Sequence, residues 1–293
     1  MKDIIVGVDT STSSEHALDR ALLEAERTGC NVRIVHAWTT PVWVGTAGMA
    51  GFAMPMPALK ESRDFAQTIV EELLAKAMSR RGSDSVIEVT TQIEEGDPAR
   101  VLSRLSTDAS LLVIGGSGHG QLASALLGSA TTYVLHHAAC PVMVVAQSTQ
   151  VQPFTRVVVG VDGSPSSRNA LQWGLQAARS LNIPLVAVHA WLIHSAPGLM
   201  PYASPPVGAT YEQDAQGWLD TQLSQAMPAD SVSTVVRRVP YGHSAGALLD
   251  EAGPDDLLVV GSRGHGGFSS LLLGSVAIQT ATHARGSVVV IRP

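Results

Sequence analysis

The chain has 293 residues, which suggests roughly two domains, and its 45% hydrophobic and 15% charged residues indicate a packed core and not disorder. The net charge of −6 argues against a nucleic-acid-binding protein, because such proteins neutralise phosphates with Lys and Arg. None of the three lysines stands in a GxxxxGK[ST] pattern, which excludes a P-loop nucleoside triphosphatase, and the two cysteines are too few for a disulfide scaffold.

No part of the chain has the pattern of a secretion signal or a membrane span. The N-terminus reaches Gly7 after only a short apolar run, so no signal peptide is expected. The most apolar stretch, residues 41–59, is broken by glycines and prolines, whereas a span needs about 20 apolar residues in one helix. We therefore expect a protein without a membrane segment, in a reducing compartment.

The first half of the chain alternates between strand and helix patterns. Residues 4–8 are a continuous apolar run, which is typical of a strand buried on both faces. Ser11 is a candidate N-cap for the next helix, and Gly29 is its expected stop, because glycine tolerates the left-handed conformation after a helix. The further predicted elements are strand 32–36, helix 61–79, strand 86–93, helix 99–105, strand 111–114, helix 122–137 and strand 142–145.

The second half repeats the first with matching residues. The segment 4–9 reappears as 157–162, and His-Ala-Trp at 36–38 reappears at 189–191. A repeat of this length indicates a duplicated domain, since solenoid repeats run to about 20–50 residues. We place the domains at 1–147 and 154–293, with a polar, proline-containing linker at the boundary between them.

The predicted elements of the second copy follow the same order. Ser164 is its candidate N-cap and Asn182 replaces the helix-ending glycine. The elements after that helix are strand 185–189, helix 213–226, strand 232–239, helix 245–251, strand 257–260, helix 268–283 and strand 288–291.

Alternating strands and helices with apolar strands predict an α/β fold, in which helices cover both faces of a parallel sheet. Right-handed crossovers make such a sheet doubly wound, and its ligands bind at the carboxyl ends of the strands. Asp9, Ala37 and Gly115 stand at the ends of three predicted strands. We therefore expect them at one edge of the sheet.

A glycine-rich loop follows the fourth predicted strand of each copy. Both loops have the pattern G-x2-G-x9-G-S, at 115–129 and 261–275. Glycines let backbone N–H groups approach an anion, and a helix start adds partial positive charge. The loops therefore favour a phosphate ligand, and the alternative is that the glycines only allow tight packing of helix against sheet.

The last glycine of each pattern, Gly128 or Gly274, falls inside a predicted helix, where glycine costs about 1 kcal/mol relative to alanine. We interpret this cost as compensated by close approach of a phosphate, with hydroxyl bonds from Ser129 and Ser275.

These motifs resemble those of the universal stress protein family. The resemblance rests on Gly-Val-Asp at 7–9, His-Ala-Trp at 36–38, the glycine pattern and the closing segment 140–145, and it covers nearly the whole chain. A tandem member of that family implies two Rossmann-like (adenine nucleotide alpha hydrolase-like) domains, a cytoplasmic location, dimer or pseudo-dimer assembly and a role in stress or dormancy responses. Because G-x2-G-x9-G-S marks the ATP-binding branch, the resemblance implies ATP, with Mg²⁺, as the ligand.

The resemblance also assigns roles to single residues. Asp9 and Asp162 would contact the nucleoside, and the alternative is that each only caps its helix. The backbone of Ala37 and Ala190 would read the adenine edge. Gly7 and Gly160 precede the aspartate segments and belong to the expected site. The phosphates would be held by Gly115, Gly116, Ser117, Gly118, His119, Gly120, Gly128 and Ser129 in the first copy and by Gly261, Ser262, Arg263, Gly264, His265, Gly266, Gly274 and Ser275 in the second.

The two loops differ at one informative position, where Arg263 replaces Ser117. An arginine facing a triphosphate adds charge-assisted hydrogen bonds and predicts tighter or more salt-sensitive binding in the second domain. The alternative is an arginine that points to solvent. His119 and His265 either donate to phosphate or are exposed loop residues.

The leading hypothesis is a regulatory ATP-binding protein with an unknown protein partner, acting as a homodimer or an intramolecular pseudo-dimer. One alternative is a slow nucleotide hydrolase, although no catalytic residue is evident. The other is a nucleotide-independent scaffold whose last strands, 142–145 and 288–291, pair edge to edge. No HExxH motif is present, so we predict no metal site built from side chains, and we expect neither nucleic acid nor membrane as a partner.

Overall fold

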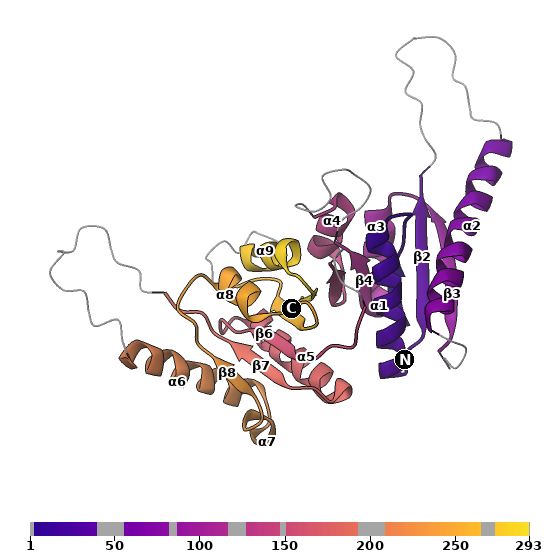
Figure 1. The fold of residues 1–293 in the computed structure, drawn as a ribbon. Coiled ribbons are helices and arrows are strands. Elements are labelled where there is room, and N and C mark those ends of the chain that lie inside the picture. Colours follow the sequence, from indigo (N-terminus) through magenta and orange to yellow (C-terminus); the bar gives the residue numbers. More distant parts are fainter. Residues whose placement is uncertain are drawn as a thin grey trace, which may run out of the picture. The chain divides into compact units, whose positions relative to one another are not determined.

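The computed structural model describes residues 3–39, 56–81, 87–116, 127–146, 151–192, 209–264 and 273–292. The chain divides into two compact units, Met1–Gln147 and Ser148–Pro293, and each is described by itself (Figure 1). Each unit contains a parallel sheet with helices packed against it, so the predicted α/β fold class is confirmed.

The first unit has five parallel strands in the order β3-β2-β1-β4-β5. Helix α1 packs against α2, and α3 against α4, as expected when helix pairs cover opposite faces of a doubly wound sheet. Its elements are β1 (Asp3–Gly7), α1 (Thr12–Thr28), β2 (Val32–Trp38), α2 (Met56–Arg81), β3 (Val89–Glu95), α3 (Pro98–Leu105), the 3-10 turn Ser106–Asp108, β4 (Ala109–Gly115), α4 (Ser129–His137) and β5 (Val142–Val145).

The second unit repeats this arrangement with five parallel strands in the order β8-β7-β6-β9-β10. Helix α5 packs against α6, and α8 against α9. Its elements are β6 (Val157–Gly160), α5 (Pro165–Leu181), β7 (Leu185–Val188), α6 (Ala209–Ala226), α7 (Ala229–Val232), β8 (Val236–Arg238), α8 (Ser244–Glu251), β9 (Leu257–Gly261), α9 (Ser275–His283) and β10 (Ser287–Ile291). Strand order reverses between β1 and β4, and between β6 and β9, which is where such folds form a ligand-binding crevice.

The capping residues of the first helix in each unit are confirmed. The hydroxyl of Ser11 accepts the N–H of Ser14 at 3.3 Å, and Gly29 ends α1 in the left-handed conformation with φ 68°. In the second unit Ser164 caps α5, and Asn182 ends it with φ 52°. Local chemistry therefore fixes both ends of these helices.

The prediction that Gly128 and Gly274 lie inside the last helix of each unit is wrong. The structure begins α4 at Ser129 and α9 at Ser275, so Gly128 and Gly274 are N-caps in extended conformation and not helix-interior residues. Apolar residues before each glycine continue the helical spacing in the sequence, and this spacing led to the expectation that the glycine lies inside the helix. The energetic cost expected for a glycine inside a helix therefore does not apply at either position.

The third strand of the second unit is also shorter than predicted. Val232 ends the short helix α7, which begins after Pro228, and only Val236–Arg238 forms β8. The neighbouring strand β7 pairs with these three residues alone, from Val186 to Val188. The strand therefore begins where its pairing with β7 begins, and not where the apolar pattern of the sequence begins.

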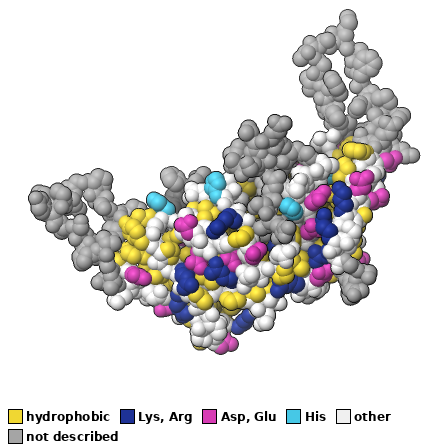
Figure 2. All heavy atoms as spheres, in the orientation of Figure 1, with side chains coloured by type: hydrophobic (Ala, Val, Ile, Leu, Met, Phe, Trp, Pro, Cys, Tyr) yellow, Lys and Arg dark blue, Asp and Glu magenta, His cyan; other side chains and the backbone are white. Residues whose placement is uncertain are grey.

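The face shown in Figure 2 carries Lys and Arg side chains interspersed with Asp and Glu. In the described part of the chain, no helix is long and apolar enough to cross a membrane.

Candidate functional site

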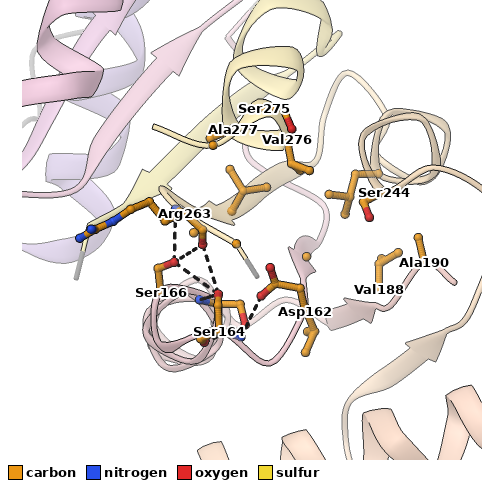
Figure 3. Close-up of a pocket in the computed structure, with 18 of the residues that line it drawn as sticks. Asp162, Ser164, Ser166, Val188, Ala190, Ser244, Arg263, Ser275, Val276 and Ala277 are labelled. Carbon is orange, nitrogen blue, oxygen red and sulfur yellow. Dashed lines mark hydrogen bonds between the residues drawn. The ribbon is translucent and has the colours of Figure 1, made fainter. Parts of the chain in front are cut away.

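A cavity of about 900 Å³ opens in the second unit at the carboxyl ends of β6, β7 and β9 (Figure 3). It lies at the crevice where the strand order reverses, between β6 and β9. The predicted site residues that line it come from four separate segments of the chain and are Gly160, Asp162, Ala190, Gly261, Arg263, Gly264, Gly274 and Ser275.

One wall of the cavity is apolar. Val188, Leu248 and Val260 line it, together with Val276 at the start of α9. None of these residues was predicted as part of the site, because an apolar side chain on a buried strand or helix looks like ordinary core until its neighbours are known. Ser244, the first residue of α8, adds a polar group beside this wall, near Ala190 (Figure 3).

Asp162 is half-buried and follows β6 by two residues. Its Oδ1 atom accepts the N–H of Ser164 at 2.9 Å, and Figure 3 shows its side chain within the ring of lining residues. In the first unit Asp9 accepts the N–H of Ser11 at 2.9 Å and the hydroxyl of the same serine at 2.5 Å. Ser11 and Ser164 are thus the N-caps of α1 and α5, and each aspartate binds the main-chain N–H of its N-cap serine.

Two histidines fix the chain just before these aspartates. The Nδ1 atom of His36 lies 2.9 Å from the carbonyl oxygen of Val8, and that of His189 lies 2.9 Å from the carbonyl oxygen of Val161. The ring of His189 also stacks on Trp218 at a centroid distance of 4.1 Å. These contacts give both histidines a structural role that holds the aspartate segment in place.

The start of α9 faces the cavity. Its N-cap is Gly274, which has no side chain to satisfy the first-turn N–H groups, and the next three residues, Ser275–Ala277, all line the cavity. The first N–H groups of a helix lack partners within it, and they carry partial positive charge. In the first unit Gly128 is the N-cap of α4 in the same way. Each helix start is thus suited to an anion.

The glycines serve different purposes. A Cβ atom on Gly261 would lie 2.7 Å from the carbonyl carbon of Ser166, and one on Gly115 would lie 2.5 Å from the hydroxyl of Ser13. These two positions are glycine because helix and sheet pack tightly there. At Gly274 the nearest atom would be 3.4 Å away, so packing does not require glycine at this position. Tight packing of helix against sheet therefore accounts for Gly115 and Gly261 but not for Gly274.

Ser262 lies behind the cavity and not in its lining. Its carbonyl oxygen accepts the N–H of Gly274 at 2.7 Å, as the carbonyl oxygen of Gly116 accepts that of Gly128 at 3.0 Å. The hydroxyl of Ser262 is buried without a hydrogen-bond partner among the described residues. Gly116 and Ser262 thus position the N-cap of the last helix.

Arg263 lines the cavity, but its guanidinium points away from Asp162 (Figure 3). Its exposed side chain lies near Arg292, whose pKa is lowered by burial and by the charge of Arg263. The structure therefore has Arg263 at the predicted place with its side chain in the alternative orientation, away from the cavity.

The remaining predicted residues of the first unit lie at the same sheet edge. Gly7 ends β1, Ala37 is the last residue but one of β2, Gly115 ends β4 and Ser129 begins α4. The predictions for Ser117, Gly118, His119, Gly120, His265 and Gly266 fall outside the described residues.

Comparison with known proteins identifies the family. The model of the universal stress protein family matches residues 1–146 and 153–292. A universal stress protein of Mycolicibacterium smegmatis (strain ATCC 700084 / mc(2)155) is 33% identical over 295 residues, which cover 99% of this chain and 97% of the relative. The chain belongs to the universal stress protein family.

Two further similarities agree with this assignment. Universal stress protein Rv2623 of Mycobacterium tuberculosis (strain ATCC 25618 / H37Rv) is 31% identical over 299 residues, which cover 99% of this chain and 96% of the relative. The crystal structure of a universal stress protein from Archaeoglobus fulgidus DSM 4304 superimposes with a TM-score of 0.66 at 18% identity, covering 99% of this chain and 96% of that chain. The last similarity shows a shared fold alone.

Proposed function

We propose that this universal stress protein binds one adenine nucleotide in each domain, ATP with Mg²⁺, and acts as a regulatory nucleotide-binding protein in a stress or dormancy response. The observation that carries this proposal is the cavity of the second unit, which is lined by the carboxylate of Asp162, an apolar wall and the start of α9. A nucleotide needs all three in one place: a carboxylate for its sugar hydroxyls, an apolar wall for its base and a helix start for its phosphates.

Each part of the ligand has a matching part of the cavity. A carboxylate has about four lone-pair sites, so Asp162 is able to accept ribose hydroxyls while it holds the N–H of Ser164. The base would lie against Val188 and Leu248, with the main chain of Ala190 at its edge. The phosphates would face the N–H groups at the start of α9. The volume of about 900 Å³ is within the range of small-molecule sites.

The residues also suit a metal that arrives with the nucleotide. In the described ranges no three His, Cys, Asp or Glu side chains gather into a metal site. Mg²⁺ is usually held by substrate phosphates, waters and one or two carboxylates, and Asp162 is a carboxylate at the cavity. When bound, the ion would neutralise part of the phosphate charge.

In the first domain we assign the same roles to the corresponding residues. Asp9 occupies the position of Asp162, the main chain of Ala37 that of Ala190, and the start of α4 at Ser129 that of α9. The proposal therefore expects two nucleotides per chain.

Mass spectrometry of ligand released from purified, undialysed full-length protein tests the proposal directly. We expect intact ATP, or another adenine nucleotide at the same site, in up to a 2:1 ratio to protein. Calorimetric titration of stripped protein with ATP and Mg²⁺ gives the affinity and the number of sites. Absence of both a released adenine nucleotide and ATP binding would overturn the proposal, and steady turnover of ATP would favour the hydrolase alternative.

We further propose that the chain assembles as a homodimer or pairs its two domains within one molecule. Analytical ultracentrifugation with and without ATP separates these cases by mass.

A further inference from the structure

We propose that Ser166 is a positioning residue that directs the N–H group of Gly264 toward the phosphates of a nucleotide in the second domain. The inference rests on the proposed nucleotide site and adds a residue that neither the glycine pattern nor the family match assigns.

The hydroxyl of Ser166 makes two hydrogen bonds to the main chain of one residue. It donates to the carbonyl oxygen of Arg263 and accepts the N–H of Arg263 at 3.3 Å (Figure 3). The hydroxyl of Ser164 lies 3.2 Å from the same carbonyl oxygen. Both serines are 3% exposed, so little water competes for these bonds. The peptide unit after Arg263 is thereby held against the start of α5.

The hydroxyl of Ser166 is not needed by its own helix. Ser164 caps α5 by accepting the N–H of Ser167 at 3.1 Å, and Pro165 fills the first helical position. Gly261 lets α5 approach β9 so closely that a Cβ atom there would meet Ser166. This close approach brings the hydroxyl of Ser166 within reach of the chain that follows β9.

The planarity of the peptide bond converts this contact into an orientation. In a trans peptide the C=O of one residue and the N–H of the next point in opposite directions. With the carbonyl of Arg263 turned toward Ser164 and Ser166, the N–H of Gly264 is turned away from them. The nitrogen of Gly264 is 3.7 Å from where a Cβ atom of Gly274 would stand, so it lies beside the N-cap of α9.

Ser166 thus adds one oriented donor to those at the start of α9. An N–H group that is already oriented before the anion binds loses no conformational entropy on binding. Loss of this fixed orientation is therefore expected to lower phosphate affinity. The nucleoside part of the ligand has no such dependence on Ser166, because Asp162 is held by the main chain of Ser164.

The test compares ligands with and without phosphates. ATP and adenosine are titrated calorimetrically into the full-length Asp9→Ala protein, in which the first site lacks its carboxylate, with and without Ser166→Ala. We expect Ser166→Ala to weaken ATP binding about tenfold, the effect of one lost hydrogen bond to a charged group, and to change adenosine binding less than about twofold.

Ser231→Ala is the matched control. Ser231 is equally buried in the same unit, and its hydroxyl also donates one hydrogen bond, to Asp230, and accepts one, from Arg179, away from the cavity. We expect no change in either affinity. Should Ser166→Ala fail to fold, as judged by circular dichroism, Ser166→Cys keeps a weak donor and is expected to give a smaller, still ATP-selective loss.

The outcomes separate this inference from the proposed function. If the Asp9→Ala parent binds ATP and Ser166→Ala binds it equally well, or loses ATP and adenosine affinity by the same factor, the role of Ser166 is refuted and the nucleotide site stands. If the parent and the wild-type protein both fail to bind ATP, the proposed function itself fails.

Discussion

The Oδ2 atom of Asp162 lies 2.5 Å from the position that a Cβ atom would occupy on Gly264. The carboxylate proposed for the ribose and the peptide proposed for the phosphates are therefore in direct contact. A side chain at Gly264 has no room unless the carboxylate of Asp162 moves.

Gly264→Ala should consequently weaken binding of adenosine as well as ATP. Displacing Asp162 removes the acceptor for the sugar hydroxyls, and we expect an affinity loss of about tenfold for both ligands. Stability should change by less than about 1 kcal/mol, because the clash is with the end of one side chain. Calorimetric titration of the second site with ATP and with adenosine measures the two affinities. Unchanged adenosine affinity would show that Asp162 does not contact the sugar.

Ser275→Ala tests the hydroxyl at the start of α9. Gly274 is the N-cap of this helix, so Ser275 is not needed for capping, and it lines the cavity. We expect ATP affinity at the second site to fall about threefold to tenfold, with adenosine affinity and melting temperature unchanged. Ser129→Ala is the equivalent change at the start of α4. An equal loss for adenosine would contradict a phosphate contact.

Two glycines within helices of the second unit should respond oppositely to alanine. A Cβ atom on Gly174 would lie 2.6 Å from Cγ2 of Val159, so Gly174→Ala overpacks the contact between α5 and β6 and should cost about 1–2 kcal/mol. Gly217 in α6 has no atom within 4 Å of such a Cβ, and Gly217→Ala should stabilise by about 0.5–1 kcal/mol. Urea denaturation compares both variants with wild type. A stable Gly174→Ala protein would show that α5 is able to shift.

The pH dependence of stability should depend on Asp256. Its carboxylate accepts hydrogen bonds from Arg156, with the shortest at 2.7 Å, from the N–H of Gly253 at 2.8 Å and from the hydroxyl of Thr155 at 2.8 Å. Burial alone would raise the pKa of Asp256, but these bonds outweigh it and hold the pKa below the ordinary 3.8. Since the folded pKa is the lower one, this stabilisation is full above pH 5 and is lost progressively as the pH falls from about 5 through the folded value.

Asp256→Asn should therefore cost about 1–2 kcal/mol at pH 7, a figure reduced because Arg156 is one-third exposed. The variant should also lose less stability than wild type between pH 5 and pH 3. Hydrogen exchange measured on peptides from β9 and α8 reports the stability of the second unit alone. An equally steep acid response in the variant would assign the pH dependence to other groups.

Much of the fold was predictable because it depends on residues close together in the chain. Continuous apolar runs predicted the strands, and Ser11, Ser164, Gly29 and Asn182 predicted helix ends, since caps bind backbone groups within a few residues. The same reasoning failed at Gly128 and Gly274. Apolar residues before them continue the helical spacing, and only the contact of each glycine N–H with a carbonyl across the loop places the true start of the helix.

The duplication, the alternation of strands and helices, and the sheet edge at which Asp162, Ala190 and Gly261 lie could all be predicted from the residues alone, because the carboxyl ends of parallel strands share one edge of a sheet. The folded chain was needed to learn which glycines serve packing and which face the cavity, where Arg263 points, and that the hydroxyl of Ser166 holds a peptide 97 residues away. Those facts depend on how closely elements remote in the chain approach one another, which no local pattern encodes.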